Sequence, residues 1–176
     1  PSAHVTVLSG ELGDAADASD NAYHVLVAPV GGAGATLDGF VVEGGHADGR
    51  AIDGLGGGLL ARQTKGSTLV VRDVVFRANR AAHGGACAVR DLARARFERV
   101  VFSDNRADAR ARDGGAGGAL FVSALRGGRA DAVNITDCVF ERNVAARYGG
   151  AAYLDYGGRL AIAGATNFSR NLAGVH

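Results

Sequence analysis

Short apolar segments separated by glycine and polar residues recur along the whole chain. Most are three to five residues long and rich in Val, Leu, Ala and Phe, as at residues 74–76, 100–102 and 138–140. No window keeps a sustained period of 3.6 residues, and clusters of Gly, Asp, Asn and Arg punctuate the segments. The pattern therefore predicts many short β-strands joined by turns.

One phrase, Phe-x-x-Asn, occurs four times, and a Gly-Gly pair follows each of the first three copies. The residues are Phe76 and Asn79, Phe102 and Asn105, Phe140 and Asn143, and Phe168 and Asn171, with the pairs Gly84-Gly85, Gly117-Gly118 and Gly149-Gly150. The Phe-to-Phe steps are 26, 38 and 28 residues. A sandwich or barrel of short strands does not need the same phrases at each turn of the chain, whereas a solenoid whose laps stack on one another does. We therefore predict an all-β, right-handed parallel β-helix of about five or six laps, with two or three strands per lap.

Each repeated residue has a structural role in such a fold. Alternation along the strand turns Phe76 and its equivalents inward, together with Val74, Val100 and Cys138, so that like residues stack along the rod. The Asn lies where the chain leaves the strand, and its amide can bond backbone groups in the turn and join a ladder of equivalent Asn residues; Asn also tolerates left-handed backbone angles. The Gly-Gly pair permits a sharp corner.

We expect a single domain, 1–176, with residues 1–35 as a lead-in of two strands and an acidic loop, and residues 36–176 as the laps. The chain begins at Pro1 and stops soon after Asn171 restarts a repeat, so we expect truncation at both ends. The long step carries two excursions, 106–113 and 123–131, on a face that in solenoids often binds ligands. Cut ends expose unpaired strand edges, which predicts end-to-end self-association unless the acidic loop or a C-terminal element covers an end.

The repeat phrases resemble those of the chlamydial polymorphic outer-membrane proteins, usually Gly-Gly-Ala-Ile and Phe-x-x-Asn. Here Cys87, Leu120 or Ala152 stands in place of the Ile. More widely, the chain is similar to bacterial secreted right-handed β-helix proteins of the pectate-lyase-like superfamily, and residues 5–14 and 37–45 resemble the lead-in of large bacterial β-helix surface proteins. The resemblance implies an extracellular or outer-membrane location in a bacterium and a passenger-type, adhesin-like role.

Composition excludes several other classes. The net charge is +1 without a clustered basic face, so we expect no nucleic-acid partner. No stretch of ~20 apolar residues predicts a membrane-spanning helix. Cys87 and Cys138 lie 51 residues apart without Cys-x-x-Cys spacing, which favours a buried role and leaves a disulfide open.

Catalytic chemistry is not evident in the motifs. The resemblance to enzymes of related folds implies that a catalytic site would need carboxylates and basic residues converging on one groove. The strands after each Gly-Gly pair carry no acidic residue, and the phrases Asn-Thr-Asp, Asp-Asp and Gly-His-Gly are absent. Asp73, Arg99 and Asp137 share one repeat position, where a solvated ladder of ion pairs is the plain interpretation. The candidate ligand-binding residues flank the same strands: Arg72, Arg77, Arg142 and Arg170.

An acidic loop offers the only metal candidate, and no other cofactor is implied. Its carboxylates could supply oxygen ligands to Ca²⁺, although the glycine-pivoted spacing of a known calcium loop is missing; they are Glu11, Asp14, Asp17 and Asp20. The leading interpretation is a non-catalytic secreted or cell-surface module that binds a polysaccharide or a host or cell-surface protein through one face. The alternatives are a fragment of a polysaccharide lyase or glycoside hydrolase acting on acidic polysaccharide, and a purely structural stalk.

Overall fold

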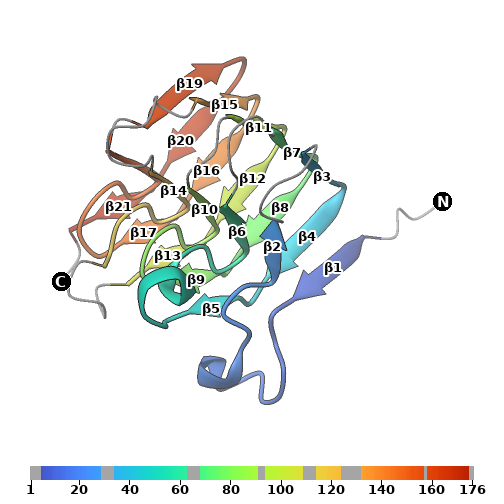
Figure 1. The fold of residues 1–176 in the computed structure, drawn as a ribbon, viewed down its shortest axis with the longest axis vertical. Helices are drawn as coiled ribbons and strands as arrows, with labels where there is room; N and C mark the ends of the chain where they lie inside the picture. The colour runs from blue at the N-terminus through green and yellow to red at the C-terminus, as the bar shows by residue number, and fades with distance from the viewer. Residues whose placement is uncertain are drawn as a thin grey trace.

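The computed structural model shows a stack of parallel strands. It describes residues 5–28, 34–62, 68–90, 94–108, 114–123, 132–156 and 158–174. In Figure 1 the strands lie side by side from β1 near the N-terminus to the last lap near the C-terminus, and four parallel sheets run along the stack. These features confirm the prediction of an all-β, right-handed parallel β-solenoid.

Sheets A and B are two of the four parallel sheets of the stack. Sheet A has six strands: β1 (Thr6–Ser9), β4 (Phe40–Glu43), β8 (Val75–Arg77), β12 (Val101–Ser103), β16 (Val139–Glu141) and β20 (Asn167–Ser169). Sheet B has five: β2 (Leu26–Ala28), β6 (Leu59–Arg62), β10 (Cys87–Arg90), β14 (Leu120–Ser123) and β18 (Ala152–Asp155).

The other two sheets complete each lap. Sheet C has five strands: β3 (Ala35–Asp38), β7 (Thr68–Arg72), β11 (Arg94–Glu98), β15 (Ala132–Thr136) and β19 (Arg159–Ala163). Sheet D has five strands of two residues: β5 (His46–Ala47), β9 (Arg80–Ala81), β13 (Arg106–Ala107), β17 (Val144–Ala145) and β21 (Leu172–Ala173). After β1, the chain makes five laps in the order B, C, A, D, so each lap has four strands where the sequence predicts two or three.

The core is built from columns of like residues. Phe76, Phe102 and Phe140 are fully buried, and their rings stack with centroids 5.4 and 4.5 Å apart. Phe168 continues the column at 4.7 Å from Phe140 but is 43% exposed, because β20 is the last strand of sheet A in the described residues. Offset ring stacking adds to the burial of apolar area, so this column is a main source of cohesion between laps.

The corners depend on residues in the left-handed region. At the corner between sheets A and D, that conformation belongs to the residue before the Asn, for example Ala78 (φ 52°) and Asp104 (φ 57°). The Asn tolerates left-handed angles but does not use that tolerance here. The Asn is needed for its side chain, and the turn residue is free to vary.

The Gly-Gly corners need glycine for two reasons. The first residue of each pair has a positive φ, as at Gly117 (67°). The second meets the next lap at close range, since a Cβ on Gly118 would lie 2.0 Å from the carbonyl oxygen of Gly150. Neither position accepts a side chain without moving backbone.

The lead-in belongs to the same stack. β1 pairs with β4, and the loop that follows β1 contains a short 3₁₀ turn, η1 (Ala18–Asp20). A second 3₁₀ turn, η2 (Ala51–Gly54), precedes β6. The backbone N–H of His46 in β5 donates to the carbonyl of Ala22 at 2.8 Å, so the first loop covers the N-terminal edge of sheet D.

The two expected excursions fall largely outside the described residues. Of residues 106–113, the first two form β13 and 109–113 are not described. Of residues 123–131, Ser123 ends β14 and 124–131 are not described.

Candidate functional site

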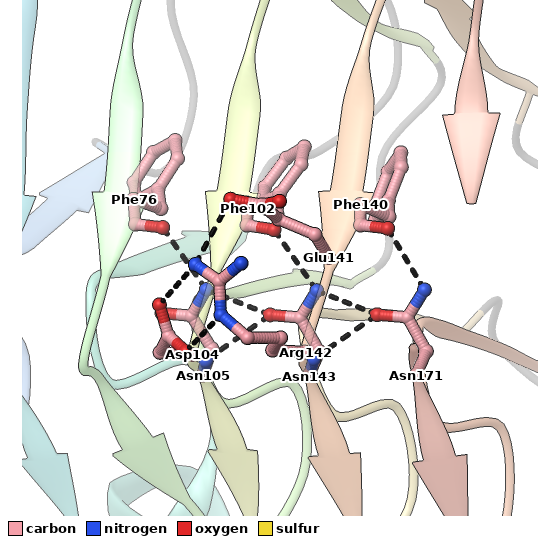
Figure 2. Close-up of polar contacts among 9 residues, drawn as sticks. All are labelled: Phe76, Phe102, Asp104, Asn105, Phe140, Glu141, Arg142, Asn143 and Asn171. Atoms are coloured by element: carbon pink, nitrogen blue, oxygen red, sulfur yellow. Dashed lines mark hydrogen bonds and ion pairs between the residues drawn. The ribbon is translucent and has the colours of Figure 1, made fainter. Parts of the chain in front are cut away.

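A ladder of buried asparagine side chains runs along the A/D corner (Figure 2). The Oδ1 atom of Asn105 accepts from both the backbone N–H and the amide Nδ2 of Asn79, each at 3.1 Å. Its Nδ2 donates to the carbonyl of Phe76 at 3.0 Å and to Oδ1 of Asn143 at 3.0 Å. Asn143 and Asn171 repeat the pattern one lap later.

The ladder is structural. Asn79, Asn105 and Asn143 are fully buried, so a ligand has no access to their amides. Every polar atom they bury is paired, which buried amides require. The Phe-x-x-Asn phrase thus encodes two inter-lap contacts, a ring stack and an amide ladder.

Three of the four candidate arginines are already paired with carboxylates. Arg72 Nε lies 2.8 Å from Asp38, and Arg77 Nε lies 2.5 Å from Glu43. Arg142 binds both Asp104, at 2.8 Å, and Glu141, at 3.0 Å.

The fourth candidate differs from the other three. Arg170 is exposed in the last lap and has no carboxylate partner within the described part of the chain. The four therefore do not form one ligand face: Arg72 lies at the end of sheet C, and the others lie on sheet A or its far corner.

The acid–base column at the C/A corner behaves as an exposed ion pair. Arg99 holds Asp73 through two hydrogen bonds, of 2.7 and 2.6 Å, and these bonds lower the pKa of the Asp73 carboxyl. The corresponding bonds from Arg142 lower the pKa of Asp104. A general acid needs a raised carboxyl pKa, so neither Asp73 nor Asp104 fits that role.

The acidic loop uses its carboxylates to order its own backbone. Glu11 accepts from Gly13 N at 2.9 Å, and Asp17 accepts from Ser19 N at 2.9 Å, which caps η1. Asp14 and Asp20 also accept backbone N–H groups of the loop. Among the described residues, which include these four, no three His, Cys, Asp or Glu side chains lie close enough to hold a metal ion.

The outer face of sheet C carries exposed polar side chains, among them arginines without a carboxylate partner in the described residues. In β11, Ala95 and Phe97 are fully buried while Arg94 and Arg96 point outward and are exposed. Arg159 on β19 shares the row of Arg94. None of these three arginines has a carboxylate partner within the described ranges, in contrast to Arg72, Arg99 and Arg142 at the corners.

A hollow of about 270 Å³ opens on this face. Its side chains come from three adjacent strands in register: Arg96 and Glu98 on β11, Asn134 and Thr136 on β15, and Ala161 and Ala163 on β19. The hollow exists because short side chains on β15 and β19 follow long ones on β11. It combines a cation, an anion, an amide, a hydroxyl and two methyl groups over a flat floor.

This arrangement suits a ligand rich in hydroxyl groups. Guanidinium and amide N–H groups donate, whereas carboxylate, amide and hydroxyl oxygens accept, so vicinal hydroxyls find both kinds of partner. The Ala161 and Ala163 methyls offer an apolar patch to the C–H face of a ring. The hollow is slightly smaller than ligand pockets usually are, which span about 300–1,000 Å³.

Sequence reasoning missed this face. Arg94 to Glu98 reads Arg-Ala-Arg-Phe-Glu, a strict alternation of polar and apolar residues that was available as a strand signal. The neighbours of Arg96 in adjacent laps, Asn134 and Ala161, are 38 and 65 residues further along the chain, and only the register of the laps brings them together.

Comparison with protein-family models, curated proteins and solved structures found no match to this chain. The helical segments of the described residues are the two short 3₁₀ turns, and none could cross a membrane.

Proposed function

We propose that the protein is a non-catalytic β-solenoid module of the secreted or cell-surface kind, which binds a glycan through the outer face of sheet C. The observation that carries the proposal is the contrast between arginines. Corner arginines such as Arg72 are neutralised by an adjacent lap, whereas Arg94, Arg96 and Arg159 present their guanidinium groups to solvent beside the hollow.

Other features support the same proposal. The parallel stack and the repeat phrases favour the secreted right-handed β-helix proteins to which the sequence is similar, and with them an extracellular or outer-membrane surface of a bacterium. Repeat folds present extended surfaces suited to polymeric ligands.

The test is retention on a panel of acidic and neutral polysaccharides, scored together with the release of cleavage products. We expect retention without products, weakened about tenfold or more by Arg96→Ala, since one charge-assisted hydrogen bond contributes about 1.5–3 kcal/mol. Asn134→Ala should weaken retention as well. Arg77→Ala is the matched control, because Arg77 is an exposed arginine on sheet A whose charge is paired with Glu43.

Three results would count against the proposal. Release of products from any polymer would favour the lyase or hydrolase alternative. Retention that Arg96→Ala and Arg77→Ala reduce equally would show that the ligand does not use the sheet C face. Absence of retention on every polymer would favour a protein ligand or a stalk.

A further inference from the structure

The outer face of sheet A carries a row of valines, one from each of four neighbouring strands (Figure 1). At β8, Val74 and Phe76 belong to the buried core, whereas Val75 between them points outward and stays partly exposed. The strands are in register, so the row runs along the middle of the stack: Val41, Val75, Val101 and Val139. An apolar row in the middle of an otherwise charged face is a candidate contact surface.

Three of these strands carry opposite charges at their two ends. β8 and β16 begin with an acidic and end with a basic residue, and β12 between them has the reverse order. All six side chains are exposed, and they are Asp73 and Arg77 at β8, Arg99 and Asp104 at β12, and Asp137 and Arg142 at β16. The sign of the charge therefore alternates from lap to lap along both edges of the valine row, and the two edges are opposite in sign at every one of these strands.

Ion pairs between laps hold these side chains in place along the edges. Arg99 pairs with Asp73 at 2.6 Å, and Arg142 lies between Asp104, at 2.8 Å, and Glu141, at 3.0 Å (Figure 2). A guanidinium has five N–H donors and a carboxylate about four acceptor sites, so an exposed pair keeps capacity for a further partner. Side chains that are already ordered also lose less conformational entropy when a second molecule binds them.

We propose that two copies of this chain associate side by side through the outer faces of sheet A, with their stacks parallel and related by a two-fold axis along the stack. Rotation about such an axis keeps each strand at its own height and exchanges the two edges of the face. Each valine then meets the same valine of the second copy. Each charge meets an opposite one, Asp73 against Arg77 and Arg99 against Asp104. The face is thus complementary to itself, as a closed two-fold contact requires.

The dimensions of the face suit this contact. Asp73 and Arg77 are four residues apart, which is about 13 Å at a rise of about 3.3 Å per residue, so the charges flank the valine row without covering it. Sheets pack face to face about 10 Å apart, a separation at which apolar side chains of the two faces touch. The contact has an apolar centre and a charged rim, which is the usual anatomy of a protein interface.

An antiparallel contact centred on β12 has the opposite electrostatic consequence. A two-fold axis across the stack at that strand would place Arg99 against Arg99 of the second copy and Asp104 against Asp104. It would also place Asp73 against Asp137. Like charges facing each other across an interface are unfavourable, so the charge pattern favours the parallel arrangement over this one.

The area of the face limits the strength of the association. Six strands about 4.8 Å apart and about 13 Å wide cover roughly 300 Å² per copy, against about 800 Å² per partner in a standard interface. We therefore expect a weak and reversible dimer, measured from about 10 μM to about 1 mM protein. The contact uses neither the sheet C hollow nor the arginines around Arg96, so this inference is independent of the proposed glycan function.

The first experiment is sedimentation velocity of the 176-residue chain over that concentration range, with charge reversal at one strand. We expect the fraction of dimer to rise with concentration in the parent. Asp73→Arg or Arg77→Asp alone should weaken dimerisation at least tenfold, because the two-fold axis makes each like-charge contact occur twice. The double variant should restore it, since β8 then again carries opposite charges at its two ends.

The double variant separates contacts between copies from contacts inside one chain. Within each chain the two substitutions place like charges beside Arg99 and Glu43, and the double variant keeps both of these clashes. Restored dimerisation therefore reports the contact between copies. The corner at residue 73 accepts an arginine, because Arg99 has the same φ of 52° at the equivalent corner. A monomer at every concentration in the parent, or a double variant that dimerises no better than the single ones, would overturn the proposal.

Single cysteines on the valine row test the orientation. Val75→Cys, Val101→Cys and Val139→Cys should each give a covalent dimer with a short bis-maleimide, because each position faces itself in the parallel arrangement. An antiparallel contact brings only the positions nearest its axis within reach. Crosslinking that fails at one end of the row would therefore overturn the parallel arrangement.

Val70→Cys is the matched control for the crosslinking. Val70 is also an outward, partly exposed valine, but it lies on the outer face of sheet C, so this variant should stay monomeric. The native Cys87 and Cys138 are buried, and the parent gives their background. Circular dichroism checks that every variant folds. Crosslinking of Val70→Cys as efficient as that of Val101→Cys would overturn the proposal.

Discussion

Asn105→Ala tests whether the asparagine ladder holds adjacent laps together. Removing the carboxamide takes away the one acceptor that the described residues offer to the backbone N–H of Asn79, a fully buried residue. It also removes one bond each to Asn79 Nδ2, the Phe76 carbonyl and Asn143 Oδ1. An orphaned buried N–H costs about 1–3 kcal/mol and each lost bond adds up to about 1 kcal/mol, so we expect a loss of about 3–4 kcal/mol of unfolding free energy.

Asn171→Ala is the matched control. It removes the same kind of acceptor from the Asn143 backbone N–H, at 3.0 Å, but Asn171 is partly exposed at the last lap. Water can replace the lost partner there, so the cost should stay near 1 kcal/mol. The two variants share their chemistry and differ in burial.

Urea unfolding monitored by circular dichroism measures both losses of unfolding free energy. The slope of unfolding free energy against urea concentration should be the same in both variants as in the parent. Hydrogen exchange provides a local readout, since the Asn79 amide should exchange much faster in Asn105→Ala. If Asn105→Ala cost no more than Asn171→Ala, the argument that the buried ladder binds the laps would be wrong.

Three further predictions concern the core, the corners and the thiols. Phe102→Ala should cost about 3–5 kcal/mol in urea unfolding, and Phe168→Ala much less, because Phe168 is 43% exposed. The pair with Arg99 lowers the pKa of the Asp73 carboxyl, so its contribution to stability is complete above the ordinary carboxyl pKa of about 3.9 and is lost as pH falls through the lowered value. Arg99→Met should therefore flatten the plot of unfolding free energy against pH in that range. Burial raises the pKa of the Cys87 thiol, so Cys87 should react with a thiol reagent only after unfolding; fast reaction in the native state would contradict its burial.

The sequence predicts those parts of the fold that depend on residues repeated in each lap. Phe76 and its equivalents mark the inward column, and the Gly-Gly pairs mark corners whose backbone geometry admits little else. These constraints are local, because each residue type is demanded by its own position in the lap.

Other features of the fold are only weakly indicated by the sequence, or not at all. The two-residue strands of sheet D, such as Arg80–Ala81, are too short for any period to be read from them. The partner of Arg72 is Asp38, 34 residues earlier, and the laps differ in length, so no fixed spacing connects such pairs. The sheet C hollow likewise depends on register between laps, which the sequence alone does not specify.

The asparagine ladder also makes the stack electrically polar. Every carboxamide turns its oxygen toward the preceding lap, as Asn105 Oδ1 does toward Asn79, and its nitrogen toward the Oδ1 of the following one. Reversing one amide would set two oxygens or two nitrogens face to face, so the whole row shares one orientation. Amide dipoles aligned in this way add, as peptide dipoles do along an α-helix. The row thus gives an all-β stack an axial field with a fixed direction, independent of its titratable groups.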